Sequence, residues 1–428
     1  MTDLQIRDLG PAFADYLRQY RDCFPQSRTA GHFDNYCRGQ LSDLPRKSVE
    51  PIALACGTSV RTLQSFLVAS EWEVDTAAER LRCVVGDYPD TLPRGELGTV
   101  GVIDETSCRR KGDETPGVQR QYPGCVGEVD NGIVTVHLGV SRGRFQTLPD
   151  ADPFLPESWS TDRDRCREGG IPDSPVHRPK WRISLEQLAR ANASGIRLDW
   201  LTFDEGYGGR PEFLCALDDR GQRFVAEVPV SFSVRPTVGA QPVRADVLLP
   251  GMRARFGIRA TIDRATIAPQ RWRASMHRVL VRDRWLTLIA AVCESTGEAK
   301  YFATNSTDPG PDRISKAAFR RATVEQCFRL AKSEAGLSHF EGRHYVGLMR
   351  HTILTLIVLG FVSMHADRLR GEKPAGDRRA GVPSPEREDG GTVPKAAWHE
   401  GGSVRRGSDP VSPEAKRTGR QIPQEKAA

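Results

Sequence analysis

The chain has 428 residues, of which 38% are hydrophobic and 27% charged, and its 61 Lys and Arg against 55 Asp and Glu give a net charge of +6. This length and composition predict a soluble protein of two or three domains. The first residues, MTDLQIRDLGP, lack the basic and apolar regions of a secretory signal. The ten cysteines include no C-x-x-C pair, which argues against zinc fingers and indicates reduced thiols in the cytoplasm. The small basic excess permits nucleic-acid binding without requiring it.

Residues 1–92 are predicted to be helical and to form a first domain that binds DNA. The segment PIALACGTSVRTLQSFL has the spacing of a helix, a turn at Gly57 and a second helix capped by Ser59. The second helix would present Arg61 and Gln64 outward, where such side chains can contact the bases or phosphates of DNA. A plain helical hairpin is the alternative interpretation.

Two apolar strands further along the chain are predicted to end in acidic residues. LGTVGVIDE ends in Asp104 and Glu105, and LDWLTF leads directly into Asp204 and Glu205. The second acid of each pair is interpreted as a bystander. Glycines follow Glu205 at once, in EGYGG, which indicates a tight turn.

The segments 133–141 and 144–150 are predicted to form a β-hairpin that turns at Arg142–Gly143. Together with the strand that ends at Asp104, they predict a mixed α/β sheet with flanking helices and a functional edge at the strand ends. Residues 93–211 would form the first part of this core.

The segment SLEQLARANASG, residues 184–195, is predicted to be a helix that precedes the second acid-tipped strand. Ser184 is the expected N-cap, with Gln187 in a capping box. Gly195 is expected to close the helix.

The remaining chain is divided by its composition. Short strand-like pieces with Gly and Pro predict a β-rich insertion over 212–305, and residues 306–367 would complete the core. The apolar run Ile353–Met364 is shorter than a membrane span needs and is predicted to be a buried core helix. Residues 368–428 are predicted to be a disordered tail.

Residues 312–336 are predicted to form one helix that carries a third acid. Glu325 borders its apolar stripe, and Arg321 and Lys332 lie on nearly the same face. The stripe consists of Val324, Cys327, Phe328, Ala331 and Ala335.

Asp104, Asp204 and Glu325 form a candidate site for phosphodiester chemistry. Carboxylates from separate elements can bind two Mg²⁺ ions, for which Mn²⁺ can substitute, and such ions activate a nucleophile and stabilise a leaving oxygen. Arg321 and Lys332 can hold the phosphates. In the alternative interpretation, the aspartates only cap turns and Arg321 pairs with Glu325 along the helix.

Three motifs carry a resemblance to a known family. They are VIDET at 102–106, TFDEGYG at 202–208, and RATVEQCFRLAKSE at 321–334, which contains R-x(3)-E-x(6)-K. In this order they resemble the DDE transposases of bacterial insertion sequences, which have an RNase H-like catalytic core. Two other stretches, RQYPGCVGEVDNG at 120–132 and LPESWSTDRDRCREGGIP at 155–172, resemble the subgroup called DDE superfamily endonucleases. The resemblance covers about residues 30–365.

The resemblance implies metal-dependent cleavage and strand transfer of double-stranded DNA, at the terminal inverted repeats of an element and at a target. It also implies a homodimer in the reaction, with no membrane association. The insertion resembles that of transposases that leave hairpin ends, where Trp272 would stack on a base; a core tryptophan is the alternative. Ala318 stands where the family signature has a tyrosine, which puts the mode of end binding in doubt.

Two other functions remain open at this point. A decayed transposase or recruited regulator would bind DNA without cutting it. A metal-dependent nuclease of the same fold would cut without needing the ends of an element.

Overall fold

The computed structural model describes residues 3–121, 130–173, 177–248, 258–264, 267–307 and 311–371. All of them belong to one compact unit, residues 1–374. The predicted tail lies outside the described residues from 372 onward.

The N-terminal part of the chain is helical, as predicted. Ser59 caps the fourth helix, because its Oγ accepts a hydrogen bond from the Thr62 amide at 3.1 Å. Gly57 turns the chain before it with a φ of +64°. The expected helix pair is therefore present. The elements are α1 (Asp3–Arg18), η1 (Arg21–Cys23), α2 (Ser27–Leu41), α3 (Val49–Ala55), α4 (Val60–Val68) and α5 (Val74–Asp90).

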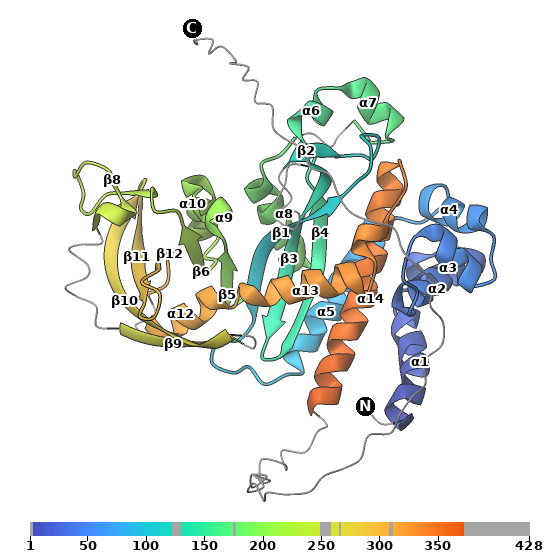
Figure 1. Ribbon diagram of the computed structural model, residues 1–428, viewed down its shortest axis with the longest axis horizontal. Helices are drawn as coiled ribbons and strands as arrows, with labels where there is room; N and C mark the ends of the chain where they lie inside the picture. The colour runs from blue at the N-terminus through green and yellow to red at the C-terminus, as the bar shows by residue number, and fades with distance from the viewer. Residues whose placement is uncertain are drawn as a thin grey trace, which may run out of the picture. The chain divides into compact units, whose positions relative to one another are not determined.

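The long helix α14 (Tyr345–Gly371) packs beside these helices (Figure 1). It is long and apolar enough to cross a membrane, but 78% of its most apolar window is buried inside the protein, as expected of a core helix. Polar side chains also bind it to the N-terminal helices. His351 Nδ1 lies 2.9 Å from the Tyr36 hydroxyl, and Arg350 donates to the carbonyl oxygen of Ser70 at 2.8 Å. The N-terminal helices and α14 consequently share one hydrophobic core.

The central sheet begins with strands in the order β4-β3-β1-β5-β6. β1 pairs antiparallel with β3 and parallel with β5, and β5 pairs parallel with β6. The predicted hairpin is β3–β4, and Gly143 turns it with a φ of +58°. The bounds are β1 (Val100–Arg109), β2 (Gln119–Gln121), β3 (Asp130–Arg142), β4 (Phe145–Pro153), β5 (Trp200–Phe203) and β6 (Phe224–Val228).

Helices cover both faces of this sheet (Figure 1). One face packs against α8 and α10, and the other against α12, α13 and α14. Alternating side chains along each strand therefore enter different cores. The bounds are α6 (Glu157–Ser160), α7 (Arg163–Glu168), α8 (Lys180–Ala193), α9 (Glu205–Gly208), α10 (Pro211–Asp219), α12 (Pro311–Phe319), α13 (Ala322–Ser333) and η2 (Leu337–His339).

The start of α8 differs from the prediction. The helix begins after Pro179, which is its N-cap, and Ser184 lies inside it. The Ser184 hydroxyl donates to the Lys180 carbonyl at 3.1 Å, and Gln187 is buried and donates to the Val136 carbonyl at 2.8 Å. The predicted end is confirmed by Gly195, whose φ is +88°.

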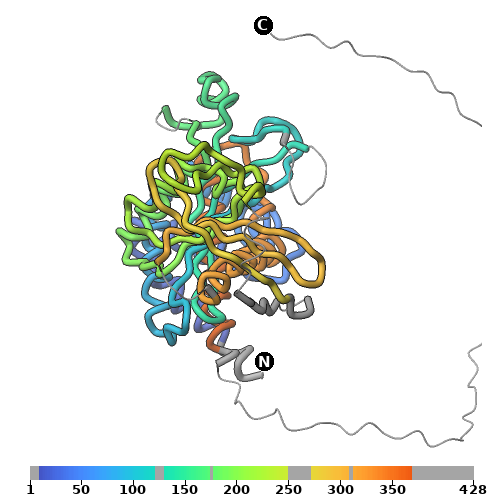
Figure 2. Tube along the Cα trace, turned by 90° about the vertical axis from the view of Figure 1, so that its left-hand side faces the viewer, coloured from blue at the N-terminus to red at the C-terminus, as the bar shows by residue number. Residues whose placement is uncertain are grey.

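The insertion extends the same sheet. Strands β12, β11, β10 and β9 continue the order beyond β6, all antiparallel to their neighbours. Figure 2 views the molecule from this side. Because β6 pairs with β5, the insertion begins after β6, and the expected boundary at 212 falls inside the core. The bounds are β7 (Ser233–Val234), β8 (Val243–Arg244), β9 (Ile258–Arg264), β10 (Ile267–Val281), β11 (Arg284–Cys293) and β12 (Ala299–Thr304).

Candidate active site

Asp104 and Asp204 lie side by side on neighbouring parallel strands. The last matched pair of β1 and β5 is Ile103 with Phe203, so Asp104 is the next residue of β1 and Asp204 directly follows β5. The predicted strand end at Asp104 is wrong, because β1 continues to Arg109 in its pairing with β3. Adjacent strands are about 4.8 Å apart. Ile103 and Phe203 enter the core under α8 and α10, and alternation directs both aspartates to the opposite face, beneath α12 and α13.

Burial perturbs both carboxylates. It raises the pKa of Asp104 to about 6, against the lowering effect of the Arg321 guanidinium and with a further rise from the charge of Asp204. Burial likewise raises the pKa of Asp204, which Arg321 lowers and Glu105 raises. Two such carboxylates favour a cation between them.

Arg321 is the cation that this site contains. Its Nη1 lies 3.0 Å from Oδ2 of Asp104. Arg321 stands at a break between α12 and α13, where one continuous helix was predicted. Ala318, at the family's tyrosine position, is a buried residue of α12, and its carbonyl oxygen accepts a hydrogen bond from the Thr202 hydroxyl at 3.4 Å.

The glycines after Asp204 provide space. The Gly206 amide donates to Oδ1 of Asp204 at 3.0 Å, which makes Asp204 the N-cap of the one-turn helix α9. A Cβ on Gly208 would lie 1.9 Å from the carbonyl oxygen of Glu227 on β6. These glycines do not have positive φ angles. They let α9 lie directly against β6.

Glu325 stands apart from the two aspartates. It is in the first turn of α13, its side chain is 65% exposed, and its Oε1 lies 3.8 Å from Arg321 Nη2. Within the described ranges, no three His, Cys, Asp or Glu side chains form a group that could hold a metal ion. Lys332 donates to the Ser107 carbonyl at 2.9 Å. Because its guanidinium contacts both Asp104 and Glu325, Arg321 links Glu325 to the pair of aspartates.

The donor types fit a hard divalent cation. Asp104 and Asp204 offer carboxylate oxygens, which Mg²⁺ prefers. Their raised pKa values and the guanidinium beside them indicate a place that favours positive charge. A third ligand from Glu325 requires its exposed side chain to turn inward.

The other predicted DNA-contacting residues lie away from this site. Arg61 and Gln64 are exposed on α4. Trp272 is 2% exposed, and its ring centroid lies 5.7 Å from that of Phe319 on α12. Its indole is a core side chain in this structure, so it presents no face to a base.

Two further acids lie near the aspartates: Glu105, which was interpreted above as a bystander, and Glu227, which was not predicted from the sequence. Glu105, on the other face of β1, accepts hydrogen bonds from Lys180 Nζ at 2.5 Å and the Tyr207 hydroxyl at 3.3 Å. Glu227 on β6 pairs with Lys300. The alternation in RFVAEV could have indicated that Glu227 faces away from the apolar residues on either side of it.

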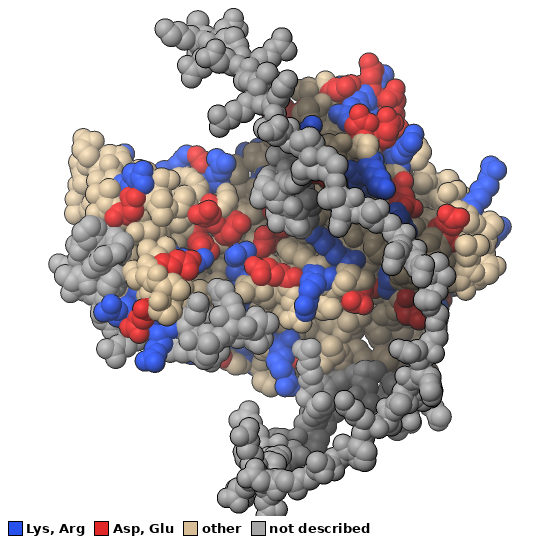
Figure 3. Space-filling view, in the orientation of Figure 1, with Lys and Arg blue, Asp and Glu red and all other residues tan. Residues whose placement is uncertain are grey.

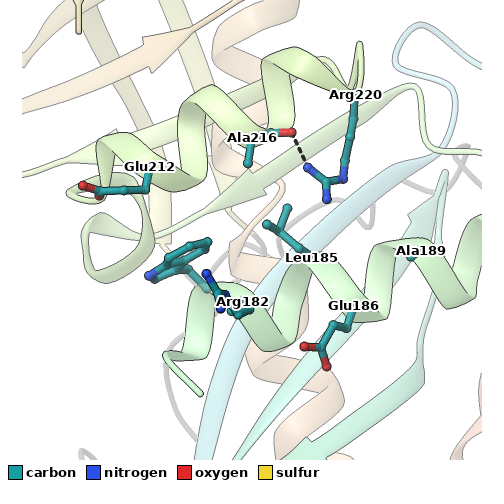
Figure 4. Close-up of a pocket in the computed structure, with 8 residues that line it drawn as sticks. Arg182, Leu185, Glu186, Ala189, Glu212, Ala216 and Arg220 are labelled. Carbon is teal, nitrogen blue, oxygen red and sulfur yellow. Dashed lines mark hydrogen bonds between the residues drawn. The ribbon is translucent and has the colours of Figure 1, made fainter. Parts of the chain in front are cut away.

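A separate surface groove lies between α8 and α10 (Figure 4). Its volume is about 430 Å³, and it is on the face of the sheet opposite to the aspartates. Its lining contains none of the predicted site residues. The lining residues are Trp181, Arg182, Leu185, Glu186, Ala189, Glu212, Ala216 and Arg220.

Charges of both signs are interspersed on the visible face of the molecule where it is not covered by grey atoms (Figure 3). Arginine–carboxylate pairs are also common across the described surface, for example Arg190–Asp152 and Arg284–Asp219. Such a surface does not by itself identify a nucleic-acid interface.

The sheet order β4-β3-β1-β5-β6, with Asp104 inside β1 and Asp204 directly after β5, defines an RNase H-like core, as predicted. Residues 19–285 match the family described as DDE superfamily endonuclease, and the chain belongs to that family. The matched range includes both aspartates and ends before Glu325.

One curated relative is the "Probable transposase for insertion sequence element IS701" of Microchaete diplosiphon. It is 29% identical over 231 residues, which are 53% of this chain and 56% of that protein. The chain thus spans little more than half the length of this relative.

Proposed function

We propose that this protein is the transposase of an insertion sequence, which binds terminal inverted repeats and catalyses DNA cleavage and strand transfer. The observation that carries the proposal is the pair Asp104 and Asp204, side by side just beyond the last matched residues of two parallel strands, with Arg321 against Asp104. Membership of an endonuclease family and the likeness to a probable transposase support it.

In this proposal Asp104, Asp204 and Glu325 hold two Mg²⁺ ions, which Mn²⁺ can replace. The ions would supply activation of the attacking oxygen and stabilisation of the leaving oxygen. Glu325 turns in from the first turn of α13 to complete the set. Arg321, released from Asp104, and Lys332 hold phosphates of the DNA backbone.

The helix pair α3–α4 is the proposed reader of the inverted repeats. Gln64 and Arg61 are exposed on α4, whose capped N-terminus would enter the major groove. Trp272 has no part in this proposal, because it is buried. Cleavage of paired ends calls for two copies of the chain, and we expect the protein to act on cytoplasmic, nucleoid-associated DNA.

The test uses labelled DNA from both flanks of the gene, where the ends of the element should lie. Purified protein and Mg²⁺ should nick these ends, and the Asp204→Asn variant should bind them without nicking. End-specific binding without nicking by the unaltered protein would indicate a decayed enzyme. Nicking of unrelated DNA at the same rate would indicate a nuclease of the same fold, and would overturn the proposal.

A further inference from the structure

Glu227 continues the row of acids across a third strand. β5 and β6 are parallel and match Phe203 with Ala226, so Glu227 stands level with Asp204, as Asp204 stands level with Asp104. On its other side Glu227 is matched with Phe302 of β12, whose ring packs beneath α12. The side chain of Glu227 is thereby directed to the same face as the aspartates.

Lys300 neutralises this third carboxylate. Its Nζ lies 2.7 Å from Oε1 of Glu227, and the two side chains are 24% and 20% exposed. Lys300 is two residues before Phe302 on β12, so it too is directed to the face of the aspartates. The ion pair is therefore an edge of the candidate site.

The backbone at Glu227 is held in place by the motif that follows Asp204. Gly208 of α9 lies so close to the Glu227 carbonyl oxygen that a Cβ would come within 1.9 Å of it. Arg321 is also close to these groups: burial lowers its pKa, but the charges of Asp104, Asp204, Glu227 and Glu325 together raise it above the usual value. Glu227 thus shares the electrostatic environment of the site.

We propose that Glu227 and Lys300 form a positioning pair that sets how strongly Asp104 and Asp204 bind a divalent cation. Lys300 keeps Glu227 from joining the metal ligands, and Glu227 keeps Lys300 from pairing with Asp204. The inference rests on the proposed function, because it concerns the same metal site.

The physical basis is the uncompensated charge that each single substitution would leave. Glu227→Gln frees the ammonium group of Lys300 on β12, two strands from Asp204, where it repels a bound cation. Lys300→Met frees the carboxylate of Glu227, level with Asp204, where it attracts a bound cation. At this separation a partly buried unit charge changes cation affinity roughly tenfold.

The experiment measures Mn²⁺ affinity of the full chain by calorimetry at low ionic strength. Lys300→Met should bind Mn²⁺ roughly tenfold more tightly, and Glu227→Gln roughly tenfold more weakly. The double variant, which removes both charges, should bind Mn²⁺ with an affinity close to that of the unaltered protein. This opposite sign is not expected of a pair that only holds strands together, since both single variants would then weaken the site.

Lys316→Met is the matched control, because Lys316 also pairs with carboxylates but is exposed on α12. Thermal unfolding of each variant checks that it is folded. If Asp204→Asn loses Mn²⁺ binding while Lys300→Met and Glu227→Gln bind as the unaltered protein does, this inference is overturned and the proposed function stands. If Asp204→Asn binds Mn²⁺ as the unaltered protein does, both this inference and the proposed function are overturned.

Discussion

The guanidinium of Arg321 lies 3.0 Å from a carboxylate oxygen of Asp104, although the two residues are 217 positions apart in the chain. The contact gives the buried aspartates a cation in the absence of metal. It also joins β1 to the break between α12 and α13. Glu325 lies four residues after Arg321, in the first turn of α13.

Replacing Asp104 should stabilise the metal-free protein at neutral pH. The pKa of Asp104 is about 6 in the folded protein, against 3.8 ordinarily. The folded state therefore holds this proton more tightly, and stability falls as the pH rises from about 4 to about 6. Asp104→Asn removes that loss, so urea unfolding should show a gain of about 3 kcal/mol at pH 7.5 that shrinks toward pH 4. A less stable variant at pH 7.5 would contradict this account.

Gly208→Ala should be strongly destabilising. The new methyl group would meet the backbone oxygen of Glu227 at 1.9 Å, and a backbone atom cannot move aside cheaply. We expect a loss of at least about 2 kcal/mol in chemical unfolding. The control is Gly31→Ala in α2, where nothing lies within 4 Å and a gain of about 0.5–1 kcal/mol is expected. Equal stability of the two variants would mean that α9 does not lie on β6.

Trp272 should matter for stability and not for DNA affinity. Trp272→Ala removes a ring buried against Phe319 and should cost about 3–5 kcal/mol, whereas Trp272→Phe should retain most of the packing. Thermal unfolding and DNA binding are to be measured on both. A Trp272→Phe protein of normal stability that bound DNA poorly would restore the base-stacking role.

Gln64 and Arg61 should contribute differently to DNA binding. Gln64→Ala should weaken binding to the inverted repeats roughly tenfold and leave unrelated DNA unaffected, because an amide reads base edges. Arg61→Ala should weaken binding to both DNAs. It should also reduce the slope of log affinity against log salt concentration by about one. Arg28→Ala, an exposed arginine on α2, is the control. Unchanged affinity in both α4 variants would exclude α4 as the reader.

The sequence could predict those parts of the fold that depend on local pattern. The apolar strand that leads into Asp204, the hairpin turn at Gly143 and the cap at Ser59 are all signalled by neighbouring residues, whereas the continuation of β1 past Asp104 to Arg109 depends on its pairing with β3. The presence of both aspartates at one edge follows from the parallel pairing of β1 and β5, which the motifs of the family implied.

Features that depend on distant contacts were not predictable in the same way. No Gly or Pro marks the break before Arg321; α12 packs on β9, β5 and β6, whereas α13 packs on β4 and β1. Ser184 carries the pattern of a cap but bonds back to Lys180. Glu227 was missed because β6 was assigned to the insertion. The parallel neighbour of β6 is β5, and α9 and α10 lie between them in sequence.

If the helix pair α3–α4 reads the inverted repeats as proposed, the core that the N-terminal helices share with α14 limits how the DNA preference can change. Tyr36 and Phe66 contact residues of α14 that lie 315 and 284 positions later in the chain. Helices joined in this way cannot be exchanged as a unit between relatives without opening that core. New specificity would have to arise by substitution of exposed residues on α4, one position at a time, while the buried side of the helix stays as it is.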